Sequence, residues 1–276
     1  MESAADRLLR LERVMKNTAG EPIRNKEQWF KHNGWGYKDT EFVIDSDGVV
    51  RITGNKYQFS GQKMPKFKEW AEKEAGIDTS KEVQIQTNIP IDPPIRNEAF
   101  LKDIAGKVDF ATDARITRID HSHGHSLQEI YILRHGKFER TVDLVVYIAD
   151  HNQAEFLIKK AIEHDVVLIP YGGGTNVTEA LMCDKTETRM IVSVDMTRMS
   201  KIKWIDKNNM MACVEAGIIG KDLERELSKS GVMCGHEPDS VEFSSLGGWV
   251  STRASGMKKN RYGNIDDIVI GIKIAT

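Results

Sequence analysis

The chain has few cysteines, no long apolar run and no excess of charge of one sign. Its three cysteines stand far apart and form no Cys-x-x-Cys pair, which argues against a disulfide scaffold or a zinc site and for reduced thiols. No segment approaches the ~18 consecutive apolar residues of a membrane-spanning helix. With 39 basic and 41 acidic residues the formal net charge is −2, so the sequence shows no electrostatic signature of nucleic-acid binding.

A run of three glycines is the most informative stretch of the sequence. The β-branched segment Val166–Ile169 predicts a strand that ends at Pro170, and Gly172–Gly174 follow almost at once. Adjacent glycines reach positive φ easily and expose successive backbone N–H groups, which together suit a pyrophosphate. Thr175 adds a hydroxyl and Asn176 an amide. A flexible linker is the alternative, but the strand and the proline before the glycines favour a phosphate-binding loop.

The loop fits neither of the two common nucleotide motifs. It lacks the Gly-Lys-Ser/Thr ending of a nucleoside-triphosphate loop and the Gly-x-Gly-x-x-Gly spacing of a Rossmann turn. Upstream, Thr141–Ile148 predicts a strand, and Asp150 with Gln153 has the spacing of a helix capping box. The helix is expected to bury the apolar face made by Ala154, Leu157, Ile158, Ala161 and Ile162. A strand, a helix and a strand in this order predict a right-handed crossover.

Other elements are predicted on both sides of this unit. Before it we expect helices over residues 4–17, 65–75 and 97–106, and a hairpin of Glu41–Ile44 with Val49–Thr53. After it we expect a strand at Met190–Asp195, a hairpin of Lys201–Asp206 with Met210–Ala216 turning at positive-φ asparagines, a helix at Lys221–Lys229 stopped by Gly231, and strands at Val232–Gly235 and Ile268–Ala275. A final strand with no covering helix suggests a chain cut within a domain.

A second segment, residues 239–256, is dominated by small and hydroxyl-bearing residues. Close backbone approach and short hydroxyl donors suit a flat aromatic ligand with a ribityl or ribose chain. A helix of small residues packed closely on a sheet would have the same composition. Composition alone leaves both interpretations open.

Several histidines stand where they could bind a ligand or a metal ion. His121, His123 and His125 alternate, and neutral imidazoles at this spacing could ligate a metal. We favour the simpler interpretation, a polar segment that enters the second half of the chain. His236 lies beside the second small-residue segment, where contact with a ligand is an alternative to a purely structural role.

Taken together, these motifs resemble the alkylglycerone-phosphate synthase (alkyldihydroxyacetonephosphate synthase) family, flavoproteins of the vanillyl-alcohol-oxidase-like group with a PCMH-type FAD domain. The resemblance extends from about Asn25 to Thr276 and rests on the segments Asn33–Tyr37, Phe67–Trp70, Ile169–Thr175, Gly235–Ser240, Gly247–Lys259 and Tyr262–Asn264. The glycine loop by itself indicates only the wider group, whereas residues 235–264 point to this family.

The resemblance implies an α+β fold: a mostly helical N-terminal region at residues 1–137, then an incomplete, two-subdomain FAD domain at residues 138–276. It implies FAD as the cofactor. The implied FAD-binding residues are Pro170, Tyr171, Gly172, Gly173, Gly174, Thr175, Asn176, Asp239, Ser240, Val241, Glu242, Phe243, Ser244, Ser245, Thr252, Arg253, Ala254 and Ser255.

The family's reaction exchanges the acyl chain of acyl-dihydroxyacetone phosphate for a long-chain fatty alcohol, in ether-lipid synthesis. The resemblance also implies a peroxisomal location, with a homodimer and peripheral membrane contact as further expectations and no nucleic-acid partner. The family's substrate-binding cap has no counterpart here, so no catalytic residue and no metal ligand is assigned. Arg7-Leu8 has the outline of a peroxisomal signal, but Val14-Met15 stands where the signal needs His or Gln. An FAD-linked hydroxy-acid oxidase and a non-catalytic flavin-binding module remain alternatives.

Overall fold

The computed structural model describes residues 31–81, 83–111 and 115–276. The chain divides into two compact units, one up to Ile85 and one from Gln86 onward, and each is treated by itself. The helix predicted at residues 4–17 and the targeting outline at Arg7–Met15 lie outside the described residues. These units are defined by how closely the chain packs. They do not test the predicted boundary between the N-terminal region (1–137) and the FAD domain (138–276), which stays a prediction.

The first unit is a small sheet with one helix. β1 (Phe42–Ile44), β2 (Val50–Ile52) and β3 (Lys63–Met64) pair antiparallel in that order. α3 (Phe67–Ala75) follows and ends at Gly76, which adopts φ 63°, a left-handed conformation that glycine tolerates at a helix end. The predicted hairpin and the predicted helix at 65–75 are therefore confirmed, and the region predicted as mostly helical also contains strands.

A four-stranded sheet organises the second unit. Its order is β4 (Asp109–Ala111), β5 (Leu144–Tyr147), β7 (Ile191–Asp195), β6 (Val167–Tyr171), with β4 antiparallel to β5 and the other pairs parallel. The predicted strands at 141–148, 166–169 and 190–195 are all present. Strand β6 runs one residue past Pro170, because it lies at the sheet edge, where a proline disrupts the fewest ladder hydrogen bonds.

Helix α7 (His151–Glu163) connects β5 to β6 as predicted. The Asp150 side chain accepts a hydrogen bond from Gln153 N, and Gln153 Oε1 accepts one from Ala149 N at 2.7 Å. Leu157 is buried, but Ile162 is 76% exposed, so the prediction that Ile162 belongs to the buried face is wrong. Ile162 lies about 140° around the helix from Leu157 at ~100° per residue, outside the apolar stripe.

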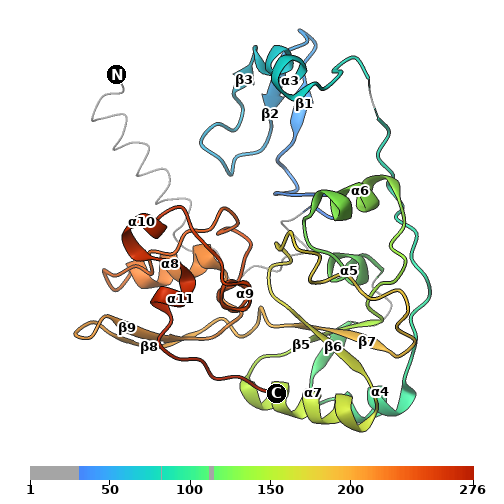
Figure 1. Ribbon diagram of the computed structural model, residues 1–276, viewed down its shortest axis with the longest axis vertical. Helices are drawn as coiled ribbons and strands as arrows, with labels where there is room; N and C mark the ends of the chain where they lie inside the picture. Colours follow the sequence, from blue (N-terminus) through green and yellow to red (C-terminus); the bar gives the residue numbers. More distant parts are fainter. Residues whose placement is uncertain (1–30, 82, 112–114) are drawn as a thin grey trace. The chain divides into compact units, whose positions relative to one another are not determined.

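Helices cover both faces of this sheet (Figure 1). On one face lie α4 (Glu98–Ile104), which confirms the helix predicted at 97–106, and α7. The other side carries α5 (Arg115–Asp120) and α6 (Leu127–His135). The main core, between the sheet, α4 and α7, consists of Phe100, Ile104, Val108, Leu144, Val146, Ile148, Leu157, Ala161, Val166, Met190, Val192 and Val194.

The remaining elements form a hairpin and a cluster of helices. Strands β8 (Ile202–Asp206) and β9 (Met211–Val214) pair antiparallel as predicted, although the positive φ of the turn falls on Met210 and not on an asparagine. They are followed by α8 (Gly220–Ser228), which confirms the helix predicted at 221–229, and by α9 (Leu246–Thr252), α10 (Lys259–Tyr262) and α11 (Ile265–Ile268). Trp249 is the largest buried side chain of the helical core.

Two predicted strands are absent from the described residues. At 232–235 the Cys234 and Gly235 N–H groups donate to the Glu224 carboxylate, so they are unavailable for a ladder. At 268–275, α11 takes up Ile268, and the residues after it pair with no strand among those described. Alternating isoleucines alone cannot form a strand, because a ladder needs a second chain segment beside it.

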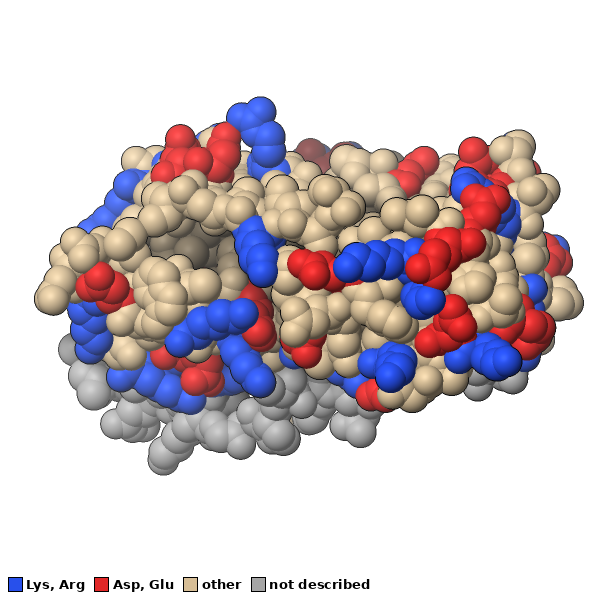
Figure 2. All heavy atoms as spheres, turned by 90° about the horizontal axis from the view of Figure 1, so that it is seen from below, with Lys and Arg blue, Asp and Glu red and all other residues tan. Residues whose placement is uncertain are grey.

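Surface charge is mixed in sign. On the face shown in Figure 2, basic and acidic side chains are interspersed, in keeping with a net charge of −2. Among the helices that the structure describes, none combines the length and apolar character needed to cross a bilayer.

A buried carboxylate joins the sheet to the chain around it, and its removal should be costly. Asp143 Oδ1 accepts a hydrogen bond from Ile95 N and Oδ2 one from Ile191 N, each at 2.8 Å, while Arg140 forms an ion pair with it. Asp143→Ala should lower the free energy of unfolding in urea by about 3–5 kcal/mol, because it leaves the buried Ile191 N–H and the Arg140 guanidinium without this partner. The exposed Asp109, which pairs with Arg198, provides the control: Asp109→Ala should cost less than about 1 kcal/mol. Equal losses in the two variants would contradict this role of Asp143.

Candidate functional site

The glycine loop lies at the carboxyl ends of the parallel strands. Tyr171, the last residue of β6, is in register with Asp195, the last residue of β7, and Gly172–Gly174 follow directly. Loops at this end of a parallel sheet are the usual position of nucleotide sites. Among the described residues, no protein group accepts a hydrogen bond from Gly172 N or Gly174 N. Both N–H groups can therefore serve an anionic ligand.

The loop packs main chain to main chain against the second predicted segment. A Cβ on Gly172 would lie 2.0 Å from Ser245 Oγ, and a Cβ on Gly173 would lie 2.0 Å from Phe243 O. At position 173 a side chain would collide with main-chain atoms, whereas at position 172 it would require the Ser245 hydroxyl to rotate away. From the sequence we expected the glycines to expose backbone N–H groups. The structure shows a second reason for glycine at these positions, which is close contact with residues 243–245.

Backbone hydrogen bonds hold this second segment in place. Gly220 N donates to Ser244 O at 3.0 Å, and Leu246 N donates to Ile218 O at 3.0 Å. Trp249 Nε1 donates to Ser244 Oγ at 2.7 Å, and Ser245 Oγ caps α9 by accepting from Gly248 N. Two hydroxyls that the composition offered to a ligand are thus used by the protein itself.

The other predicted site residues fall in different places. Thr252–Ser255 lie at the C-terminal end of α9, the opposite end from Ser245, where Arg253 adopts φ 48° and pairs with Asp266. Asn176 Oδ1 accepts a hydrogen bond from Ala180 N, so this amide oxygen stabilises a turn. The structure therefore brings the glycine loop and residues 243–245 into contact. Residues 252–255 lie at the other end of the short helix α9 from Ser245.

His236 is buried beside the helical core with unsatisfied polar atoms. It is 1% exposed, and its ring centroid lies 4.8 Å from that of Trp249. Neither ring nitrogen has a hydrogen-bond partner among the described residues. Burial lowers the pKa of His236, so the imidazole is neutral and offers one donor and one acceptor. Buried polar groups are rarely left without partners, so His236 is a candidate for contact with a ligand.

The alternating histidines buttress the glycine loop, a role that the sequence interpretation did not identify. His125 N donates to Asn176 O and His125 Nδ1 donates to Gly174 O, both at 2.7 Å. A Cβ on Gly124 would lie 2.3 Å from Asn176 O, so this contact is also between main chains. His121 forms a buried pair with Asp195. The alternation of the three histidines was visible in the sequence, but the residues that they contact are identified only by the fold.

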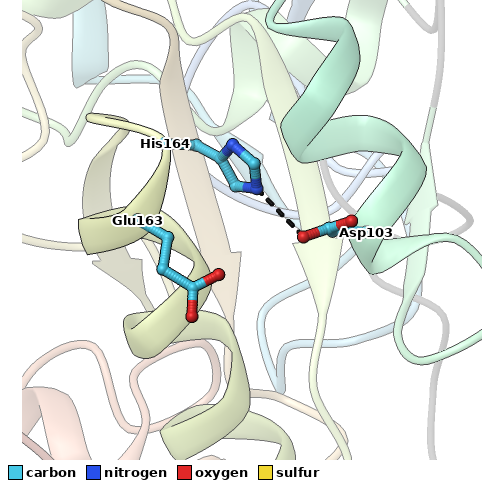
Figure 3. A group of neighbouring side chains, drawn as sticks. All are labelled: Asp103, Glu163 and His164. Atoms are coloured by element: carbon cyan, nitrogen blue, oxygen red, sulfur yellow. Dashed lines mark hydrogen bonds and ion pairs between the residues drawn. The ribbon is translucent and has the colours of Figure 1, made fainter.

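A group with metal-ligand chemistry lies elsewhere, between α4 and α7. Figure 3 shows the His164 ring directed at the Asp103 carboxylate, with Glu163 nearby; His164 Nε2 lies 3.0 Å from Asp103 Oδ2. Lys160 Nζ lies 2.9 Å from Asp103 and 2.6 Å from Glu163. His164 and then Lys160 lower the pKa of Asp103. The Lys160 ammonium already forms ion pairs with both carboxylates, so the group is a surface ion-pair network.

The two glycines that touch residues 243–245 should differ in their tolerance of a methyl group. Gly173→Ala should lower the free energy of unfolding by several kcal/mol (roughly 2–4), because the methyl group meets the backbone of Phe243 and Ser244, which cannot move aside. Gly172→Ala meets mainly the Ser245 hydroxyl, which can rotate, and should cost about 1 kcal/mol through the weakened helix cap. Urea denaturation of both variants checks the order. Gly172→Ala as the more damaging change would contradict this account of the packing.

Comparison with known proteins shows what the chain is similar to. The family described as FAD binding domain matches residues 142–276. The alkyldihydroxyacetonephosphate synthase of Caenorhabditis elegans is 46% identical over 252 residues, which cover 90% of this chain and 42% of that protein. A solved structure of an alkyldihydroxyacetonephosphate synthase superposes with a TM-score of 0.80 at 33% identity, covering 90% of this chain and 47% of that one.

Similarity to a dehydrogenase covers less of the chain. A mitochondrial D-lactate dehydrogenase (cytochrome) of Arabidopsis thaliana is 31% identical over 147 residues, covering 51% of this chain and 25% of that protein. The chain thus matches the synthases over nine-tenths of its length, while it spans less than half of theirs. Residues 142–276 form an FAD binding domain, with FAD as the cofactor. The chain is therefore a homologue of the alkyldihydroxyacetonephosphate synthases.

Proposed function

We propose that FAD lies with its pyrophosphate on the glycine loop, at the junction with residues Phe243–Ser245. The observation that carries this proposal is the main-chain contact that joins two segments 70 residues apart, both of which the family resemblance implies as FAD-binding. In the proposed site the loop Pro170–Asn176 holds the pyrophosphate, chiefly through the backbone N–H groups of its glycines. Asp239–Ser245 and Thr252–Ser255 are proposed as further contacts along the cofactor.

The residues present fit such a cofactor. Gly172 N and Gly174 N have no acceptor among the described protein groups, and the two nitrogens of the buried His236 are likewise unsatisfied. An FAD molecule has the phosphate oxygens, ribityl hydroxyls and ring heteroatoms that would satisfy them. When bound, FAD supplies the electron-accepting ring; the protein binds it, orients it and excludes water.

We propose, from the family, that the complete enzyme exchanges the acyl chain of acyl-dihydroxyacetone phosphate for a long-chain fatty alcohol in ether-lipid synthesis. This remains a proposal because the chain spans 42% of the relative's length. The residues described here hold and position the cofactor, and none is assigned as an acid or base. A peroxisomal location, homodimer formation and peripheral contact with a lipid surface belong to the same proposal.

An FAD-linked oxidase of a hydroxy acid is the second candidate, and a non-catalytic FAD-binding module the third. The synthase is favoured over the oxidase because identity to the synthase extends over 90% of the chain, whereas identity to the D-lactate dehydrogenase extends over 51%. Identity over 90% of the chain therefore extends well beyond the FAD binding domain at residues 142–276.

Flavin content and turnover separate the three candidates. The purified chain should show the yellow absorbance of oxidised flavin, and denaturation should release FAD. It is then assayed with acyl-dihydroxyacetone phosphate plus hexadecanol, and in parallel with glycolate or lactate plus an electron acceptor. Ether formation identifies the synthase, oxidation of the hydroxy acid identifies the oxidase, and bound FAD without either reaction identifies a binding module. A protein that neither retains nor rebinds FAD would contradict all three.

Replacing His236 by phenylalanine should affect folding and cofactor binding in opposite directions. Without FAD, His236→Phe should raise the free energy of unfolding by about 1–2 kcal/mol, because it removes two unsatisfied buried nitrogens while keeping a ring against Trp249. With FAD, affinity should fall about tenfold or more, because a donor and an acceptor are lost. Thermal unfolding of the stripped protein and FAD titration check the two signs. A variant that is less stable and binds FAD normally would show that His236 has a structural role instead.

A further inference from the structure

The turn at residues 124–126 holds the end of the glycine loop by two of its carbonyl oxygens. His125 Nδ1 lies 2.7 Å from Gly174 O, and His125 N donates to Asn176 O, also at 2.7 Å. A backbone carbonyl can only accept a hydrogen bond, so His125 carries a hydrogen on Nδ1 and donates it to Gly174 O. One residue therefore binds two successive carbonyl groups on the same side of the loop.

Glu129 keeps this turn in place from helix α6. Its side chain is 0% exposed. Its Oε1 accepts a hydrogen bond from Gly124 N at 2.6 Å, and its Oε2 accepts one from Ser126 N at 2.9 Å. These are the two residues that flank His125, so one carboxyl group ties both sides of the turn to the helix. The position of His125 beside the loop is thus set by the protein itself.

The hydrogen bond to the Gly174 carbonyl also sets the direction of the next N–H group. In a trans peptide the C=O and N–H groups lie in one plane and point in opposite directions, and the described residues contain no cis peptide bond. The Thr175 N–H group therefore points away from His125. No protein group among the described residues accepts a hydrogen bond from Thr175 N, so it is available to a ligand, like the N–H groups of Gly172 and Gly174.

Glycine at position 174 makes such a restraint necessary. Gly174 adopts φ 67°, and a residue without a Cβ reaches several backbone conformations at little cost. Rotation about the bonds on either side of the Gly174–Thr175 peptide would exchange the positions of its C=O and N–H groups. The carbonyl oxygen would then repel an anion at the place where the N–H group had attracted it. The hydrogen bond from His125 opposes this rotation, because the imidazole N–H would lose its acceptor.

We propose that His125 is a positioning residue for the FAD pyrophosphate: it binds the Gly174 carbonyl and so holds the Thr175 N–H group towards the phosphate oxygens. This inference rests on the proposed FAD site. Successive N–H groups beside a residue of positive φ form a concave anion site, and Gly174 N and Thr175 N are such a pair. The sequence drew attention to the Thr175 hydroxyl, whereas the geometry assigns the main-chain N–H group of the same residue.

Two replacements of His125 separate its hydrogen bond from its ring. His125→Phe keeps a ring beside His123, whose centroid lies 5.7 Å away, but has no donor. His125→Asn places an amide NH₂ close to the position of Nδ1 and keeps the donor. When FAD is titrated into the flavin-stripped full chain, His125→Phe should bind it about tenfold or more weakly, because a hydrogen bond to a charged group is lost. His125→Asn should stay within about threefold of the wild type.

The Thr175 amide gives a readout that a purely structural role of His125 would not change. In protein labelled with isotopic nitrogen at threonine, the Thr175 amide proton should shift downfield when FAD binds to the wild type or to His125→Asn, because it enters a charge-assisted hydrogen bond. It should not shift in FAD-saturated His125→Phe. His135→Phe makes the same replacement at an exposed ring that packs on Tyr131, and should keep the wild-type affinity and the wild-type shift.

Three results would overturn the positioning role and leave the proposed FAD site intact. These are an FAD affinity of His125→Phe equal to that of the wild type, equal losses of affinity in the two His125 variants, and a wild-type Thr175 amide that does not respond to bound FAD. A wild-type chain that binds no FAD would overturn both proposals. If His125→Phe fails to fold, the Thr175 shifts in the wild type and in His125→Asn still decide the matter.

Discussion

Close approach of two main chains, at the contact between the glycine loop and residues 243–245, is the constraint on which the rest of the site depends. A Cβ at Gly173 would lie 2.0 Å from Phe243 O, so this contact exists only because position 173 carries no side chain. Two parts of the chain hold the loop in place. Strand β6 fixes the position where the loop begins, and the backbone of residues 243–245 fixes the path that it follows. An anion site built from N–H groups needs such rigidity, since amide dipoles stabilise charge only if they are held in place.

The same contact completes a closed series of contacts around the second unit. Met196 N donates to Tyr171 O at 2.9 Å, and Gly217 N donates to Met199 O at 2.8 Å. Ile219 then bridges Ser245, and residues 243–245 return to the glycine loop. The sheet and the helical cluster are therefore joined at several backbone positions and not through side chains alone. A displacement of the backbone at any of these contacts should shift the others, because closely packed main-chain atoms have little room to relax.

Local features could be predicted from the sequence, and features that depend on distant partners could not. The strands around α7, the Asp150 cap and the hairpin turning at residues 207–210 were recognisable because spacing and turn residues act over a few positions. The strand expected at 268–275 has the right alternation but no partner among the described residues. The glycines were correctly identified as special, yet their contact with Phe243 and Ser245 joins positions about 70 residues apart in the chain. No local pattern indicates that distance.

The polar groups that have no hydrogen-bond partner within the protein differ from those that the composition suggested as ligand contacts. Composition suggested that serine hydroxyls would bind the ligand, but Ser244 Oγ is bonded to Trp249 and Ser240, and Ser245 Oγ caps α9. Among the described residues, the Gly172 and Gly174 N–H groups and both nitrogens of the His236 ring are left without a hydrogen-bond partner. The proposed FAD site is therefore built from amides and an imidazole, with serines as structural supports. Removing a supporting serine should weaken cofactor binding only as far as it shifts the backbone that the serine holds.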